Sequence, residues 1–220
     1  NSDRAKSGKY GLDAANPRYY TDTYGTSTTN KGNVNGHIIR IKESGANAAA
    51  TTFNWDIYLF GAQSDANGTN VNISGLTNDN DFSSPDGLFF SQATKGLMWL
   101  QTDDGAYRDV TNCMMLAAVP GTHGDGTANY KVTNTAVPTN GNADQEITTF
   151  VGKDASASTL KRFLVGPKGC EITGITETPD GKTIFINIQH PGENTADADI
   201  ATPANYESHW PASDTTSRPR

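Results

Sequence analysis

Apolar residues recur at every second position in several short stretches of the chain, which is the period of a strand with one buried face. In residues 51–61, for example, Phe53, Trp55, Ile57 and Leu59 fall on one side. Gly, Pro, Asn or Asp residues bound each stretch, as turns require. Eight strands are predicted in this way, at residues 36–43, 51–61, 87–92, 96–103, 113–119, 160–166, 170–178 and 182–190.

Helical periodicity is scarce, and only residues 142–154 could hold one turn or a short helix. Residues 67–82 and 120–144 are polar and rich in Gly and Asn, which predicts long surface loops or weak outer strands. Residues 194–220 form a polar tail with three prolines, which we expect to wrap the surface. The pattern therefore predicts an all-β fold with long loops, in one domain over residues 1–220.

An internal repeat makes this fold prediction more specific. Residues 84–104 align with residues 171–190, and both copies read as a hairpin. The alignment pairs Gly87 with Gly174, Leu88 with Ile175, Gly96 with Gly181, Trp99 with Phe185, and Leu100 with Ile186. Two such hairpins indicate the inner strands of two β-propeller blades, and the long insertions suggest an incomplete propeller. The alternative is a β-sandwich, in which Pro-Asp-Gly hairpins are also common.

Composition and charge exclude several classes of protein. The 220 residues carry a formal net charge of −7, which argues against a nucleic-acid partner. No apolar run is long enough for a transmembrane helix, and no stretch of these residues reads as a signal peptide. The chain begins without Met, which processing or truncation would explain. No serine-hydrolase elbow, zinc-protease motif or phosphate-binding loop occurs.

Carboxylates at the starts of the repeated hairpins are the first candidates for chemistry. The repeat puts Asp86 and Glu171 near equivalent strand starts, so they could meet around one axis. Converging carboxylates repel each other unless a cation neutralises them, which indicates a metal site. For Asp86, a turn role in the Ser-Pro-Asp-Gly sequence is an equal alternative. Glu171 follows Cys170 in an apolar strand start, so either Lys168 or a metal must compensate its charge.

Further candidates lie at the strand ends and in one corner. Asp103 and His190 end the second strands of the two hairpins, and His190 should be extended because it precedes a proline. Either could bind metal, and His190 could also bind phosphate, although a hydrogen-bonded corner histidine is an equal alternative. Arg18 follows a proline, a placement that suits oxyanion binding or a surface ion pair. Cys170 is read as a small buried hydrophobe, with a thiolate ligand as the alternative.

Several ordered motifs resemble the C-terminal part of PhoX-type alkaline phosphatases. They are DAANPR, NGHIIRIKE, SPDGLFF…GLMWLQTDDG, NCMMLAA and RFLVGPKGCEITGITETPDGKTIFINIQHPGE, with a terminal SHWP…RPR. The resemblance implies a β-propeller phosphatase that acts on phosphomonoesters with an iron–calcium site and is exported by the twin-arginine route to the periplasm or beyond. It implies that Glu171 stands at a metal-ligand position, while Asp86, Asp103 and His190 lie in matching motifs. The family's N-terminal half, with a cysteine ligand of the iron pair, has no counterpart here.

The leading hypothesis is therefore a C-terminal fragment of a metal-dependent phosphatase, inactive alone and completed by the missing N-terminal part. Glu171, Asp86, Asp103 and His190 would contribute metal ligands, and Arg18 or Lys168 would add positive charge near the phosphoryl group. Two rivals are a calcium-stabilised propeller that binds a glycan or a protein without catalysis, and a propeller that hydrolyses sugar lactones.

Overall fold

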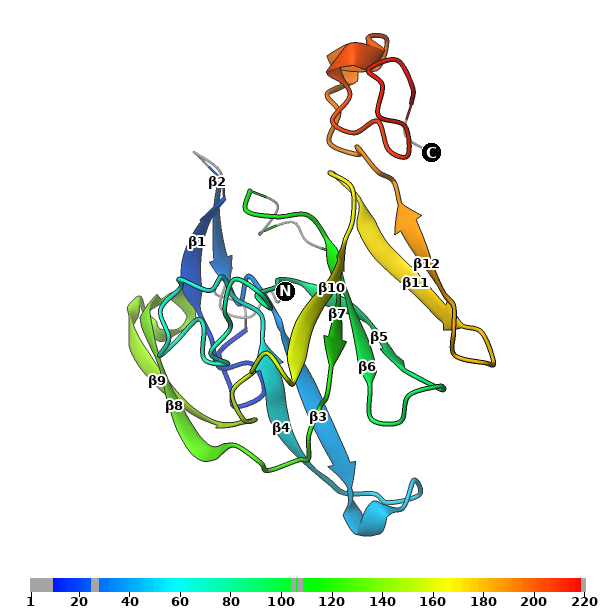
Figure 1. The fold of residues 1–220 in the computed structure, drawn as a ribbon. Helices are drawn as coiled ribbons and strands as arrows, with labels where there is room; N and C mark the ends of the chain where they lie inside the picture. The colour runs from blue at the N-terminus through cyan, green and yellow to red at the C-terminus, as the bar shows by residue number, and fades with distance from the viewer. Residues whose placement is uncertain (1–9, 25–27, 104–105, 107–108, 219–220) are drawn as a thin grey trace.

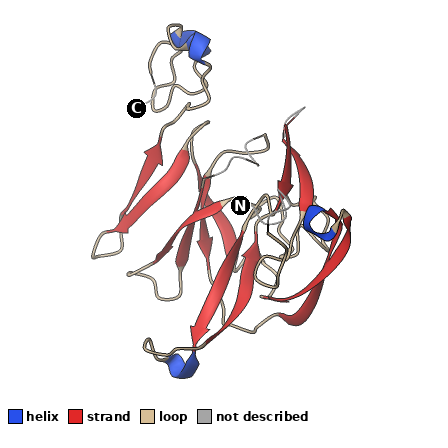
Figure 2. Ribbon diagram, turned by 180° about the vertical axis from the view of Figure 1, so that it is seen from behind, coloured by secondary structure: helices blue, strands red, loops and turns tan. Residues whose placement is uncertain are grey.

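The protein is seen here as a computed structural model, which describes residues 10–24, 28–103, 106 and 109–218. Almost all of its regular structure is β, as the hydrophobic pattern predicts (Figures 1 and 2). The strands within the described ranges are β1 (Tyr20–Tyr24), β2 (Thr28–Gly32), β3 (His37–Glu43), β4 (Phe53–Phe60), β5 (Pro85–Phe90), β6 (Met98–Thr102), β7 (Met114–Ala118), β8 (Thr127–Val137), β9 (Ala143–Val151), β10 (Leu160–Val165), β11 (Glu171–Glu177) and β12 (Ile184–Gln189). Four short 3₁₀ turns are η1 (Ser44–Ala46), η2 (Pro138–Asn140), η3 (Asp197–Asp199) and η4 (Pro203–Asn205).

The strands form separate sheets that stand beside one another rather than one continuous sheet (Figure 1). Two sheets have four strands each, in the orders β3-β4-β9-β8 and β10-β7-β6-β5. Two have two strands each, β1-β2 and β11-β12. Neighbouring strands are antiparallel except for the single parallel pairing of β4 with β9. The predicted all-β fold is confirmed, and its arrangement is that of an incomplete β-propeller.

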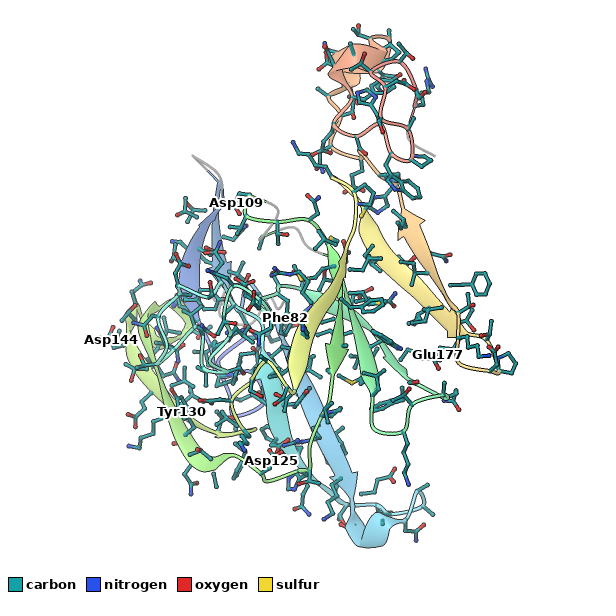
Figure 3. All side chains as sticks on the ribbon, viewed as in Figure 1. Phe82, Asp109, Asp125, Tyr130, Asp144 and Glu177 are labelled. Carbon is teal, nitrogen blue, oxygen red and sulfur yellow. The ribbon has the colours of Figure 1, made fainter. Side chains whose placement is uncertain are left out.

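The core lies in layers between these sheets. One layer packs β4 against β6 and β7 through residues such as Leu59, Leu100 and Leu116, with Phe82 at its centre (Figure 3). A second layer joins the other face of β6 and β7 to β11–β12 through Trp99, Met115, Ile172 and their neighbours. All five residues of β6 are consequently buried, because both faces of this strand are covered.

The two repeated hairpins are β5–β6 and β11–β12, and their agreement extends to small details. Each hairpin shifts register near the same aligned glycine, Gly87 or Gly174. A side chain on either glycine would meet an amide of the partner strand, that of Gln101 in one copy and Asn187 in the other. Trp99 is 5% exposed and the aligned Phe185 is 60% exposed, because a further sheet covers only the first hairpin.

One strand differs from its sequence-based prediction. Residues 143–151 lie in the stretch predicted to hold one turn or a short helix and form β9, whereas residues 127–137 form the outer strand β8, one of the two alternatives for that region. The inward positions of both strands include polar residues, Thr149 and Asn134, which are fully buried. Their side chains bond Ala14, Pro17 and Tyr19 of the N-terminal segment, so polar residues occupy places where the strand pattern needs apolar ones.

The C-terminal residues 194–218 form a compact lobe beyond the end of β12 (Figure 1). They turn back on themselves through bonds such as that of the Asn205 amide with Asp199, 2.7 Å long. The tail thus extends the molecule at one end and does not run along the sheets. In the described ranges, no helix has the length and hydrophobicity that a membrane crossing requires.

Candidate functional site

Three predicted carboxylates come together at the open ends of the two repeated hairpins, opposite their turns. Glu171 begins β11, Asp86 lies at the start of β5, and Asp103 directly follows β6. We call these three residues the carboxylate cluster. The side chains of Glu171 and Asp86 share a hydrogen bond, and Asp103 lies close enough to act on the charge of Glu171. The structure therefore joins residues 85 positions apart, as the repeat predicts.

The cluster holds Glu171 in an environment that disfavours its charge. Burial, the negative charges of Asp103 and Asp86, and the hydrogen bond that protonated Glu171 donates to Asp86 together raise the pKa of Glu171 above its usual value. The neighbouring His190 opposes this shift, with its Nε2 3.6 Å from Oε2 of Glu171. A cation bound between these carboxylates would remove the repulsion, which is the property expected of a metal site.

His190 adopts a conformation that differs from the prediction. Although it precedes a proline, its φ is +36°, in the left-handed region, instead of extended. The corner is stabilised by its ring: Nδ1 lies 2.9 Å from a carboxylate oxygen of Glu193 and 3.4 Å from the carbonyl oxygen of Gly169. His190 thus links Glu171 to the corner that leads into the C-terminal lobe.

The raised pKa of Glu171 predicts how stability depends on pH. At pH values between the pKa of Glu171 in the unfolded chain and its higher pKa in the folded state, the folded state keeps this proton and the unfolded chain has lost it. Stability therefore falls as pH rises through the folded-state pKa. In metal-free buffer at pH 7, Glu171→Gln should therefore raise Tm by roughly 2–4 °C, equivalent to about 1 kcal/mol. At pH 4 the gain should disappear, because wild-type Glu171 is then protonated. Thermal melts at both pH values check this, and a lower Tm for the variant at pH 7 would contradict it.

The donor set of the cluster fits a hard cation better than iron. Carboxylate oxygens are the ligands that Ca²⁺ prefers. Within the described ranges, however, no three His, Cys, Asp or Glu side chains are close enough to enclose an ion, so water or other protein groups must complete the shell. The nearby thiol of Cys170 packs against Gly166, and burial raises its pKa to about 12. These residues alone therefore do not make an iron site.

Arg18 lies elsewhere and has a different environment from the predicted one. Its guanidinium is fully buried over the rings of Tyr20 and Phe60. All five of its N–H groups have protein acceptors, which are Asn33 Oδ1 (3.1 and 2.6 Å), Gly36 O (2.6 Å), Gly61 O (3.0 Å) and Val71 O (2.5 Å). This is neither a surface ion pair nor an open oxyanion site. In this geometry Arg18 has no donor left for a substrate.

Lys168 lies at the corner before β11, and its side chain is 65% exposed. Its ammonium is 4.0 Å from Glu207 of the C-terminal lobe. The basic group beside Glu171 is therefore His190, whereas the sequence suggested either Lys168 or a metal for this place.

Contacts between the hairpins that hold the cluster were not predicted. Glu177, at the far end of β11, lies between the two hairpins (Figure 3) and accepts a bond from Trp99 Nε1 at 3.0 Å. Gln101 donates to the carbonyl oxygen of Gly174 at 3.1 Å. The two donors, Trp99 and Gln101, lie on one face of β6. The repeat aligns them with Phe185 and Asn187, so the alignment already marked these positions as equivalent in the two hairpins. By contrast, Asp180 stabilises the hairpin turn, where it accepts bonds from the Thr178 hydroxyl and the backbone N–H of Lys182.

Comparison with known proteins identifies the family. The sequence profile of the family described as alkaline phosphatase PhoX matches residues 10–192. Among solved structures, PhoX of Pseudomonas fluorescens in complex with vanadate, a transition state analogue, superposes with a TM-score of 0.57 at 30% identity. The match covers 85% of this chain and 25% of that protein. No curated protein sequence matches the chain. The chain therefore belongs to the alkaline phosphatase PhoX family.

Proposed function

We propose that this chain is the part of a metal-dependent alkaline phosphatase that supplies the carboxylate cluster, and that the whole enzyme hydrolyses phosphate monoesters. The observation that carries the proposal is the approach of Glu171 to Asp86 and Asp103 in a buried position that disfavours its charge. All three residues lie within the segment matched by the family. The related protein binds vanadate, which supports a site for a phosphoryl group.

The cluster residues would hold Ca²⁺, which when bound neutralises charge on the phosphoryl oxygens. His190 orients Glu171 and is a further ligand candidate. Lys168, on the exposed corner, would attract the substrate and add positive charge beside it. Arg18, for which the sequence predicts a place near the phosphoryl group, would instead order the loops that carry the site. Ligands for iron would come from outside this chain.

The proposed enzyme is longer than this chain, which spans a quarter of the length of the related protein. Phe185 and the edge of β12, with no sheet against them in the described structure, suit contact with the remaining part. We place the enzyme in the periplasm or the medium, as the family resemblance implies. Alone, the 220-residue chain should bind calcium weakly, with a Kd of roughly 10⁻⁴–10⁻³ M, and should lack phosphatase activity.

An activity assay on the longer protein tests the proposal. With p-nitrophenyl phosphate at alkaline pH, we expect hydrolysis that vanadate inhibits and that a chelator of divalent cations lowers at least tenfold. Adding Ca²⁺ back should restore the activity if calcium is the metal that the cluster holds. Hydrolysis that resists the chelator would contradict the metal role, and absence of hydrolysis in the metal-loaded longer protein would contradict the phosphatase. Metal-loaded protein that cleaves a sugar lactone instead would favour the lactonase rival.

A further inference from the structure

Ser84 stands immediately before β5, which carries Asp86, and has an unusual backbone. Its φ is +48°, in the left-handed region that a non-glycine residue rarely occupies. The next residue is Pro85, and a residue before proline is normally extended. Two preferences are thus overridden at one position. Such strain persists only where the surroundings fix the conformation, and it is often found at functional sites.

The surroundings fix Ser84 through both of its backbone polar groups. Its N–H donates to the carbonyl oxygen of Asn35 at 2.9 Å. Its carbonyl oxygen accepts a bond from the N–H of Asp103 at 3.1 Å. Asp86 follows two positions later on the chain. One strained residue therefore links two carboxylates of the cluster to the turn that connects β2 to β3, outside the sheet of β5 and β6.

That turn, residues 33–36, is itself held from several sides. The N–H of Asn35 donates to the Tyr20 hydroxyl at 2.8 Å. Arg18 bonds the side chain of Asn33 and the carbonyl oxygen of Gly36, which also accepts from the N–H of Gly61. A side chain at Gly61 would collide with the carbonyl oxygen of Asn35, so the two segments are in close contact. The acceptor that holds Ser84 consequently has little freedom to move.

We propose that Ser84 is a positioning residue for the cluster: its left-handed backbone, held by Asn35, sets where Asp86 and Asp103 stand relative to each other and to Glu171. This inference rests on the proposed function, because it assigns the strain to binding of a cation by these carboxylates. The backbone and not the hydroxyl performs the role, since the described contact of the hydroxyl is with the neighbouring Ser83 at 3.2 Å. Arg18 also positions the cluster, but indirectly: it holds the turn of residues 33–36, whose Asn35 in turn holds Ser84.

Two substitutions separate the backbone from the side chain. Ser84→Gly keeps both backbone hydrogen bonds, but glycine reaches positive and negative φ equally and no longer locks the position. Ser84→Ala keeps the constraint on φ and removes only the hydroxyl. Calorimetric titration of each protein with Ca²⁺ should show about tenfold weaker binding for Ser84→Gly, the loss typical when support around metal ligands is removed. Ser84→Ala should bind within about twofold of wild type.

Metal-free melts complete the test. The Tm of Ser84→Gly should lie within roughly 2 °C of wild type, because relief of strain offsets the added freedom of glycine. Equal Ca²⁺ affinity for wild type and Ser84→Gly would overturn the positioning role and leave the proposed function standing. Equal losses in the glycine and alanine variants would assign the effect to the hydroxyl and also overturn it. A wild-type chain that binds no Ca²⁺ would overturn the metal role proposed for the cluster, and this inference with it.

Discussion

Arg18→Met is expected to destabilise the chain by about 4 kcal/mol, a loss that lowers Tm by roughly 10 °C. The physical reason is the full burial of a guanidinium whose five N–H groups all bond protein acceptors. Methionine fills much of the same volume, but it donates nothing. The buried carbonyl oxygen of Val71 and the amide oxygen of Asn33 would then lose these partners, and each orphaned acceptor costs about 1–3 kcal/mol.

Two further variants identify the origin of this loss. Arg18→Lys keeps the charge, but one ammonium cannot reach acceptors arranged around a planar fork, so it should also destabilise strongly. Lys131→Met is the matched control, because Lys131 forms an exposed ion pair with Glu146. It should change stability by less than about 0.5 kcal/mol. Urea titrations and thermal melts measure all three. A Tm within 3 °C of wild type for Arg18→Met would show that the buried contacts are not decisive.

Glu171→Gln is expected to lower the phosphatase activity of the longer protein at least 100-fold. Glutamine has nearly the shape of glutamate, but it lacks the negative charge that a cation requires. A metal ion contributes several kcal/mol of charge stabilisation in the transition state, and about 2.7 kcal/mol corresponds to a factor of 100. The same substitution should leave the metal-free fold more stable, as argued from the raised pKa of Glu171. Higher stability with lower activity is the combination expected for a residue kept for function.

The control for this prediction is Glu146→Gln, which removes a solvent-exposed carboxylate from β9. Its activity should remain within about twofold of wild type, because a surface ion pair contributes little. Steady-state kinetics with p-nitrophenyl phosphate, together with the calcium content of each purified protein, provide the readouts. Full activity and full calcium content in Glu171→Gln would remove Glu171 from the proposed site.

Strands with a dense pattern of apolar residues could be predicted from the sequence, and β9 could not. β4 and β6 show continuous or alternating apolar residues, and this pattern remains readable although the polar residues Asp56, Gln101 and Thr102 in these strands are also buried. In β9, the buried Thr149 interrupts the alternation, and the remaining apolar residues Ile147, Phe150 and Val151 have helical spacing. Thr149 is tolerated there because its hydroxyl bonds a backbone carbonyl of a distant segment. That partner is visible only in the folded chain.

Much of the candidate site could be predicted because the repeat carries positional information. Two copies of one hairpin place their strand starts at the same end of neighbouring sheets, so Asp86 and Glu171 are brought together without further detail. The role of Arg18 could not be found in this way. Its partners are mainly backbone carbonyl oxygens, which every residue has and which leave no trace in the sequence.

Local chemistry along the chain, namely alternation, turn residues and the repeat, was sufficient to specify an all-β fold and the approach of Asp86 to Glu171. Tertiary structure alone decided the backbone conformations of Ser84 and His190, both of which precede a proline and yet have positive φ. The reason is that local preferences at these positions amount to a few kcal/mol and are overcome by contacts with segments distant along the chain. Contacts between segments far apart along the chain also bury Arg18 and bring Glu171 near Asp103.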